Sequence, residues 1–175
     1  MEALIVIDVQ NDFCPGGTLA VPEGDQIIED VNRLACEAPL VIATRDWHPR
    51  DHGSFAERGG TWPVHCVRDT PGAQLHPELR AKLDVIIDKG QAPDLEGYSG
   101  FEDTDLERLL RVRGVDTVHI VGLALDYCVK ATALEARHAG FDVVVHREAT
   151  RAVDVEPGDG ERAVEELRSA GVQVQ

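Results

Sequence analysis

The sequence predicts a single α/β domain over residues 1–175, built on a mostly parallel six-stranded sheet with helices on both faces. Short apolar runs rich in β-branched residues recur along the chain, and such runs are typical of parallel strands that are covered on both faces. Segments with helical periodicity lie between several of these runs. An alternation of strands and helices favours a parallel sheet with right-handed crossovers, and 175 residues suit one domain.

The expected elements follow one another in chain order. The apolar runs predict strands at 4–7, 40–43, 85–87, 118–121, 143–145 and 172–174. Helical patterns span about 25–36, 105–113, 127–139 and 160–170, and three of them end before Gly114, Gly140 and Gly171, where glycine commonly ends a helix. The alternation is interrupted from about 45 to 80, a stretch that holds both tryptophans and four of the seven histidines. A loop region of this length is typical of a binding or catalytic segment.

Composition narrows the function classes. The formal charge of −15 and a pI near 4.7 disfavour binding to nucleic acid or to an anionic membrane. The N-terminal apolar run is too short for a secretion signal, and no stretch approaches the roughly 20 apolar residues of a membrane span. The four cysteines form no CxxC pair and are too sparse for a disulfide-stapled domain. We therefore expect a cytoplasmic protein with reduced thiols.

Reactive side chains follow four of the predicted strands. Asp8 follows the first strand, Asp46 and His48 the second, Lys89 the third, and Cys128 lies just beyond the fourth. Ligands of open α/β sheets bind outside the carboxyl ends of the strands. We therefore expect these side chains to converge at one edge of the sheet.

Cys128 is the candidate nucleophile. It falls at the start of a predicted helix, where free backbone N–H groups and the helix dipole lower the pKa of a thiol. Asp8 is the candidate proton acceptor, and Lys89 would balance the negative charge. The alternatives are a buried structural cysteine, a capping carboxylate at Asp8 and a solvated lysine at Lys89.

A metal site is the second candidate. Asp46 and His48 are two residues apart, so in extended backbone both side chains point the same way. His52 and His65 follow in the same loop region. Carboxylate and imidazole ligands suit one divalent ion such as Zn²⁺, Fe²⁺ or Mn²⁺, and the spacing matches no structural zinc finger. The alternative is a set of histidines that are simply hydrogen-bonded in a polar loop.

Five segments of the sequence resemble a known family. They are IVIDVQNDFCPGG around Asp8, RDWHPRDHGSF, TWPVHCV, DKG and VGLALDYCVKATALEA around Cys128. Together they are similar to nicotinamidases, also called pyrazinamidases, of the isochorismatase-like cysteine hydrolase superfamily. The resemblance implies an isochorismatase-like, Rossmann-like three-layer fold. It also implies hydrolysis of nicotinamide to nicotinic acid and ammonia through a cysteine thioester, with pyrazinamide as a side substrate.

The resemblance implies a role for each matching residue. The implied catalytic triad is Asp8, Lys89 and Cys128. The implied metal ligands are Asp46, His48 and His65, with His52 as the first choice for a fourth ligand and Glu57 as the second. A cis peptide bond between Leu123 and Ala124 is implied, with an oxyanion hole formed by the amides of Ala124 and Cys128. The implied walls of the nicotinamide pocket are Phe13, Trp62, Tyr98 and Leu123.

Two other functions remain open from the sequence alone. One is an amidase or isochorismatase-like hydrolase, with or without a metal, that acts on another small substrate. The other is a catalytically silent ligand-binding homologue. Isochorismatases share the implied triad but generally lack the Asp-x-His pair and the downstream histidine, so these residues favour the nicotinamidases. Assembly into a homo-oligomer is also left open.

Overall fold

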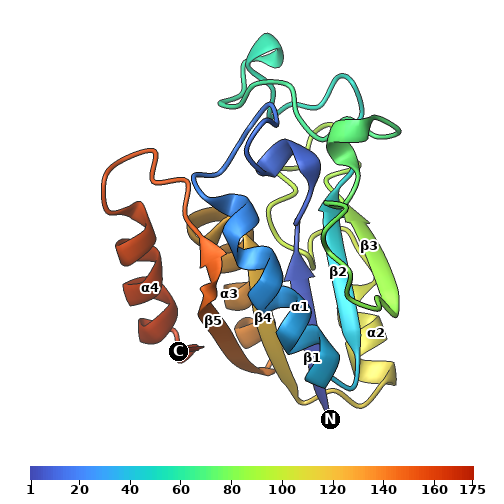
Figure 1. Cartoon of the computed structure of the whole chain (residues 1–175), viewed down its shortest axis with the longest axis vertical. Helices are drawn as coiled ribbons and strands as arrows, with labels where there is room; N and C mark the ends of the chain where they lie inside the picture. Colours follow the sequence, from blue (N-terminus) through green and yellow to red (C-terminus); the bar gives the residue numbers. More distant parts are fainter.

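All six strands belong to one sheet and run parallel, in the order β3-β2-β1-β4-β5-β6 (Figure 1). The computed structural model describes residues 1–175. The strands are β1 Glu2–Ile7, β2 Val41–Asp46, β3 Val85–Lys89, β4 Thr117–Leu123, β5 Asp142–Arg151 and β6 Gln173–Val174. The predicted α/β class is therefore confirmed, and the sheet is parallel throughout.

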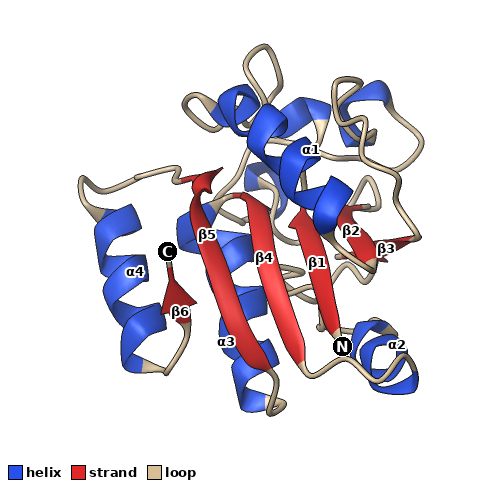
Figure 2. Cartoon of the chain, turned by 60° about the horizontal axis from the view of Figure 1, so that its bottom comes forward, coloured by secondary structure: helices blue, strands red, loops and turns tan.

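The two faces of the sheet are covered by different helices (Figure 2). The helices are α1 Ile28–Glu37, α2 Leu106–Val112, α3 Lys130–His138 and α4 Asp159–Ser169. The apolar side of α1 packs on one face, whereas α2, α3 and α4 pack on the other. None of these helices combines the length and the apolar character needed to cross a lipid bilayer.

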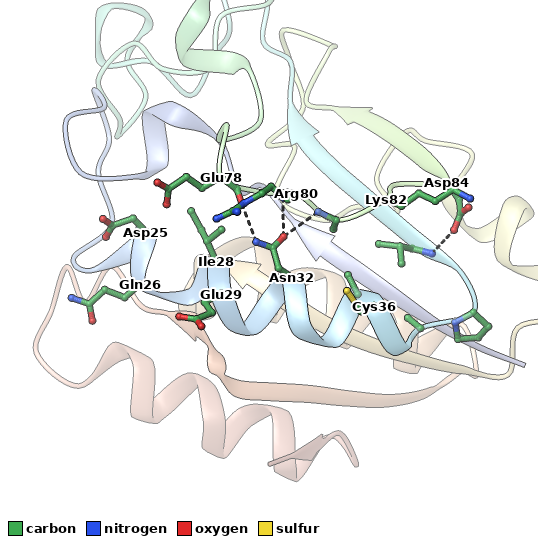
Figure 3. Close-up of a pocket in the computed structure, with 15 residues that line it drawn as sticks. Asp25, Gln26, Ile28, Glu29, Asn32, Cys36, Glu78, Arg80, Lys82 and Asp84 are labelled. Atoms are coloured by element: carbon green, nitrogen blue, oxygen red, sulfur yellow. Dashed lines mark hydrogen bonds between the residues drawn. The ribbon is translucent and has the colours of Figure 1, made fainter.

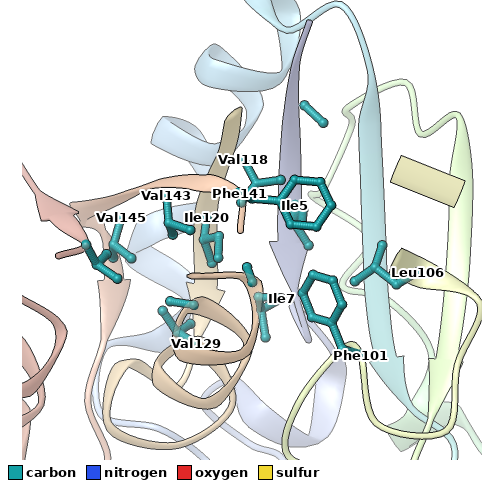
Figure 4. Close-up of a cluster of buried hydrophobic side chains, with 14 of the residues drawn as sticks. Ile5, Ile7, Phe101, Leu106, Val118, Ile120, Val129, Phe141, Val143 and Val145 are labelled. Atoms are coloured by element: carbon teal, nitrogen blue, oxygen red, sulfur yellow. The ribbon is translucent and has the colours of Figure 1, made fainter. Parts of the chain in front are cut away.

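The side chains of β1 alternate between the two faces. Ile5 and Ile7 lie in the cluster beneath α2, α3 and α4, together with Phe141 and Val129 (Figure 4). Leu4 packs in the opposite cluster, beneath α1. Burying an aliphatic side chain of this size stabilises the fold by about 1.5–3 kcal/mol. A wholly apolar strand follows because both faces of β1 are covered.

Short helical turns complete the chain. Four are 3₁₀ turns, η1 Asn11–Phe13, η2 Gly24–Ile27, η3 Ala56–Arg58 and η4 Pro71–Ala73, and a fifth, η5 Leu125–Val129, is π-helical. The predicted helices near 25 and 127 thus begin as η2 and η5 before α1 and α3 continue them. The stretch from 45 to 80 contains only η3 and η4 beyond the end of β2, as its irregular pattern predicts.

Several strands extend beyond their apolar runs, and in β2 and β3 the extension reaches residues of the predicted site. Asp46 is the last residue of β2 and Lys89 the last of β3, and the two are paired in register. The apolar run marks only the part of a strand that lies between helical layers, while ladder hydrogen bonds continue past it. Both polar side chains are therefore held by the sheet itself rather than by a loop.

Gly122 lets β1 and β4 approach closely near their carboxyl ends. Its φ is +113°, and a Cβ atom there would lie 2.0 Å from the carbonyl oxygen of Ile7. Both the positive φ and the lack of space exclude a larger side chain. The close approach brings the residues that follow β1 and β4 next to one another.

Candidate active site

Asp8, Lys89 and Cys128 meet at the carboxyl edge of the sheet. Asp8 directly follows β1, Lys89 ends β3, and Cys128 lies in the η5 turn that follows β4. The ammonium nitrogen of Lys89 lies 2.9 Å from Asp8 Oδ2 and 3.5 Å from Cys128 Sγ. A carboxylate oxygen of Asp8 also lies within 4.8 Å of the Cys128 sulfur. The structure therefore brings the three predicted catalytic residues together.

The backbone directs Asp8 into this cluster. Asp8 leaves the strand conformation with a φ of +48°, a conformation that aspartate tolerates better than most residues. Its Oδ1 accepts a hydrogen bond of 2.7 Å from the Thr44 hydroxyl. Its Oδ2 is buried and, although close to Lys89 Nζ, lies outside hydrogen-bond geometry with it. That oxygen forms an ion pair while keeping a lone pair free to accept a proton.

Burial dominates the proton affinities of the cluster. It raises the pKa of the Cys128 thiol well above its ordinary value; Lys89 opposes this, and Asp8 and Asp46 add to it. Burial likewise raises the pKa of Asp8 despite the adjacent ammonium. The expectation that the helix start lowers the pKa of Cys128 is therefore not met. Desolvation outweighs the helix terminus, so the resting group is a neutral thiol that needs a proton acceptor.

A second cluster lies beside the first. Carboxylate and imidazole atoms of Asp46, His48 and His65 lie within 4.8 Å of one another. Asp46 Oδ2 is 3.3 Å from His48 Nε2 and 4.0 Å from His65 Nε2. The three predicted metal ligands are thus brought together, and all are buried.

The donor set of this second cluster fits a divalent ion. The Nδ1 atom of His48 lies 2.8 Å from the carbonyl of Gly90, and that of His65 lies 2.7 Å from the carbonyl of Pro63. Only a protonated Nδ1 can donate to a carbonyl, so in each neutral imidazole the lone pair lies on Nε2, on the side of Asp46. Such outer hydrogen bonds orient the histidine ligands of metal sites.

Charge at the second cluster is already arranged for a cation. Burial would raise the pKa of Asp46, but the Lys89 ammonium and, when protonated, the His48 imidazolium hold the pKa below its ordinary value, so the group is a carboxylate. Burial would lower the pKa of His48, but Asp46 raises it, so a metal ion that binds there would displace a proton from this imidazole. Burial lowers the pKa of His65 and outweighs the opposing effect of Asp46, so this imidazole is neutral near pH 7. A carboxylate beside a neutral imidazole suits zinc, iron or manganese.

Lys89 connects the two clusters. Its ammonium donates hydrogen bonds of 2.5 Å to Asp46 Oδ1 and 2.7 Å to the carbonyl of Gly97, in addition to its ion pair with Asp8. The oxygens of Asp8 and Asp46 and the sulfur of Cys128 also lie within 4.8 Å of one another. The Lys89 ammonium, rather than a metal ion, is the cation that these three atoms surround.

The two choices for a fourth metal ligand lie in different places. His52 is fully buried, and its ring stacks on that of His48 with centroids 3.9 Å apart. Its Nδ1 contacts the Ser54 hydroxyl and its Nε2 has no partner, but it is not part of the three-residue cluster. Burial lowers the pKa of His52 to about 4. Glu57 lies on the exposed η3 turn.

A cavity opens over both clusters. Its polar lining includes Cys128, Asp46, His48 and His65, and its apolar and aromatic lining includes Phe13, Leu19, Val21, Trp62, Tyr98, Ala124, Tyr127 and Val153. The Trp62 indole donates a hydrogen bond of 2.9 Å to the Tyr98 hydroxyl, and its ring meets Tyr127 edge to face. These aromatic rings form one connected wall. Phe13, Trp62 and Tyr98 therefore line this cavity, and their contact with a substrate stays a prediction from the resemblance.

Leu123 lies elsewhere. Its side chain is fully buried in the cluster beneath α1 and does not line the cavity. The peptide bond between Leu123 and Ala124 is cis, as the resemblance implies. Ala124 lines the cavity at the start of the turn that carries Cys128.

Sequence reasoning missed several contributors. Thr44 donates a hydrogen bond to the Asp8 carboxylate, and Gln10 accepts one from the Asp46 amide. Tyr127 and Val153 line the cavity. Gln10 and Tyr127 lie within two residues of Asp8 and Cys128, so proximity in the sequence could have indicated them. Thr44 and Val153 approach the site only through the fold, and no local pattern marks them.

A larger groove along α1 carries no comparable chemistry (Figure 3). Its volume is about 960 Å³, against about 40 Å³ for the cavity over Cys128. The carboxamide of Asn32 donates to the carbonyl of Glu78 and accepts from the amides of Arg80 and Ala81. These bonds join α1 to the segment that leads into β3. The Asn32 side chain in this groove is thus engaged in holding the fold.

Among the remaining cysteines, Cys66 lies beside the second cluster, where its carbonyl accepts a hydrogen bond of 3.0 Å from the amide of His48. All four cysteines are free, and Cys14 and Cys66 are buried while Cys36 is exposed. His119 and His146 are paired between neighbouring strands, with His119 Nδ1 2.9 Å from His146 Nε2.

The amino-acid sequence matches a known domain family and proteins of known activity. The chain matches the isochorismatase domain family over residues 2–175. It is 42% identical over 196 residues to a nicotinamidase of Escherichia coli, an alignment that covers 97% of this chain and 92% of the relative.

Solved structures agree with the sequence comparison. A pyrazinamidase of Pyrococcus horikoshii in complex with zinc is 51% identical, with a TM-score of 0.92 and coverage of 99% of this chain and 98% of that chain. PnC1 from L. infantum in complex with nicotinate is 36% identical, with a TM-score of 0.95 and coverage of 100% and 92%. The likeness therefore extends over nearly the whole chain.

Proposed function

The chain belongs to the isochorismatase family, and on that premise we propose that it is a nicotinamidase, a hydrolase that converts nicotinamide to nicotinic acid and ammonia. One observation carries the proposal. Lys89 Nζ lies 3.5 Å from Cys128 Sγ and 2.5 Å from Asp46 Oδ1, so it joins the candidate nucleophile to the candidate metal ligands. Cys128 and Asp46 also line the same aromatic cavity. Pyrazinamide, a similar aromatic carboxamide, is a further substrate of the same reaction.

The first half of the reaction forms a thioester. Asp8 accepts the Cys128 proton while the sulfur attacks the carboxamide carbon, because the pKa of the resting thiol is too high for a standing thiolate. The amides of Ala124 and Cys128 donate to the oxyanion of the tetrahedral intermediate. Asp8 then returns the proton to the amide nitrogen, and ammonia leaves.

The second half releases the acid. Asp8 accepts a proton from water as the water oxygen attacks the thioester carbon, and the Cys128 sulfur leaves and is reprotonated. The fixed positive charge of Lys89 stabilises negative charge on the sulfur and on Asp8 throughout the cycle. Its three oxygen contacts hold the ammonium in place for both steps.

Asp46, His48 and His65 would hold one divalent ion beside the cavity. When bound, this ion would supply a Lewis acid that anchors the pyridine nitrogen and orients the substrate. Zinc is the first candidate, since a zinc complex is known for the related pyrazinamidase. Phe13, together with the wall formed by Trp62 and Tyr98, packs against the pyridine ring of nicotinamide and excludes water from it.

Ammonia release from nicotinamide tests the proposal directly. Purified protein supplied with zinc, iron or manganese should release ammonia and nicotinic acid in equal amounts, and Cys128→Ala should abolish both. Cys14→Ala is the matched control, because Cys14 is a second buried thiol outside the cavity. Turnover that persists in Cys128→Ala, or no turnover with any of the three metals, would refute the proposal.

A further inference from the structure

The side chain of Gln10 makes three hydrogen bonds to backbone groups, two of them to Asp46. The Gln10 side chain is fully buried. Its Oε1 accepts from the amide of Asp46 at 2.8 Å, and its Nε2 donates to the carbonyls of Asp46 at 2.9 Å and Ala73 at 2.8 Å. The Gln10 carboxamide thus satisfies both the N–H and the C=O group of Asp46.

The Gln10 carboxamide takes the place of the β1 backbone that would otherwise pair with Asp46. The β1–β2 ladder pairs Val6 with Ala43, and the Asp8 amide still donates to the carbonyl of Thr44 at 3.2 Å. Asp8 then turns away with a φ of +48°, so the backbone of β1 no longer reaches Asp46. Buried backbone N–H and C=O groups need partners, and a carboxamide has the same donor and acceptor as a peptide group.

Asp46 is the residue whose position matters most for both clusters. Its Oδ1 accepts from the Lys89 ammonium, while its Oδ2 faces the Nε2 atoms of His48 and His65. On the other side of β2, Asp46 is in register with Lys89 of β3. Only Gln10 fixes the Asp46 peptide on the β1 side.

We propose that Gln10 is a positioning residue that fixes the Asp46 carboxylate between the Lys89 ammonium and the metal-ligating imidazoles. The inference rests on the metal site of the proposed function. Groups that orient metal ligands commonly change metal affinity by 10–100-fold when they are removed. Removal of the Gln10 carboxamide should therefore weaken metal binding even though Gln10 contributes no ligand.

Zinc affinity, measured by competition with a chelator, is the decisive readout. Gln10→Met keeps the length of the side chain but removes all three hydrogen bonds, and we expect it to weaken zinc binding about tenfold or more. Asn32→Leu is the matched control, because Asn32 also makes three hydrogen bonds to backbone groups but lies in the groove along α1. It should lower the melting temperature and leave zinc affinity unchanged.

The outcomes separate this inference from the proposed function. Wild-type zinc affinity in Gln10→Met, or equal weakening in Asn32→Leu, overturns the positioning role. A wild-type protein that binds no zinc instead refutes the metal site of the proposed function. If Gln10→Met does not fold, Gln10→Asn decides, because it keeps the uncharged carboxamide on a side chain too short to hold both backbone groups of Asp46. Unchanged zinc affinity in a folded Gln10→Asn would equally overturn the inference.

Discussion

Replacing Lys89 with methionine tests the charge balance on which the site depends. The ammonium is fully buried, and its contacts are Asp46 Oδ1, Asp8 Oδ2 and the carbonyl of Gly97. Methionine is of similar length but carries no charge. Lys89→Met therefore leaves two buried carboxylates facing each other without a cation between them.

The expected cost follows from those contacts. Removing one partner of a buried ion pair destabilises a protein by about 3–5 kcal/mol, because the remaining charge stays buried without compensation. Here two carboxylates lose the same partner, but protonation of one of them limits the loss. We therefore expect Lys89→Met to lower the free energy of unfolding by about 3–5 kcal/mol at pH 7. Asp8→Asn combined with Lys89→Met should recover about 1 kcal/mol or more, since only one charge then remains.

Urea unfolding of the metal-free protein measures both values. The two tryptophans supply a fluorescence signal, and far-ultraviolet circular dichroism checks that the transitions coincide. A loss below about 1 kcal/mol for Lys89→Met would refute the reasoning, since losses of that size are typical of exposed ion pairs. A double variant no more stable than Lys89→Met would show that Asp8 is not the group left uncompensated.

Three further predictions concern Gly122, His65 and His146. Gly122→Ala should destabilise the fold by about 2–5 kcal/mol in urea unfolding, because it adds a backbone clash to the strain of a positive φ. Gly114→Ala, with a positive φ but open space, should cost less, and equal costs would contradict the clash. His65→Ala should lower bound zinc by elemental analysis, whereas retained zinc would remove His65 from the ligand set. Burial and the neighbouring His119 imidazole lower the pKa of His146 in the folded protein. Below about pH 6.5 the unfolded chain therefore binds more protons than the folded chain, and the free energy of unfolding should decrease as the pH is lowered. His146→Gln should flatten that fall in urea unfolding measured from pH 7 to 5, and an unchanged slope would exclude His146.

The helix and strand pattern was predictable because it is local. Apolar runs such as the one in β1 are typical of strands covered on both faces, and the structure places Ile5 and Leu4 on opposite faces as that requires. The polar half of β5 was missed, since hydrogen bonds to neighbouring strands rather than apolar burial define it. The sequence pattern marks burial and does not mark pairing.

Convergence of the reactive residues was also predictable. Asp8, Asp46, Lys89 and Cys128 each follow or end a strand, and all parallel strands end at the same edge. The contacts between these residues were not predictable. The 2.5 Å bond from Lys89 to Asp46 joins the two clusters across a strand pair, and nothing in either segment alone indicates it.

The sequence by itself determined the α/β class, the edge of the sheet where the chemistry lies and the side chains present there, because each depends on local periodicity and on residue type. Only the tertiary structure decided their protonation and their supports. The pKa of Cys128 is raised by burial rather than lowered by the helix start, and Gln10 replaces a strand partner of Asp46. Desolvation and hydrogen bonding depend on what lies within a few ångströms in space, and residues far apart in the chain supply those neighbours.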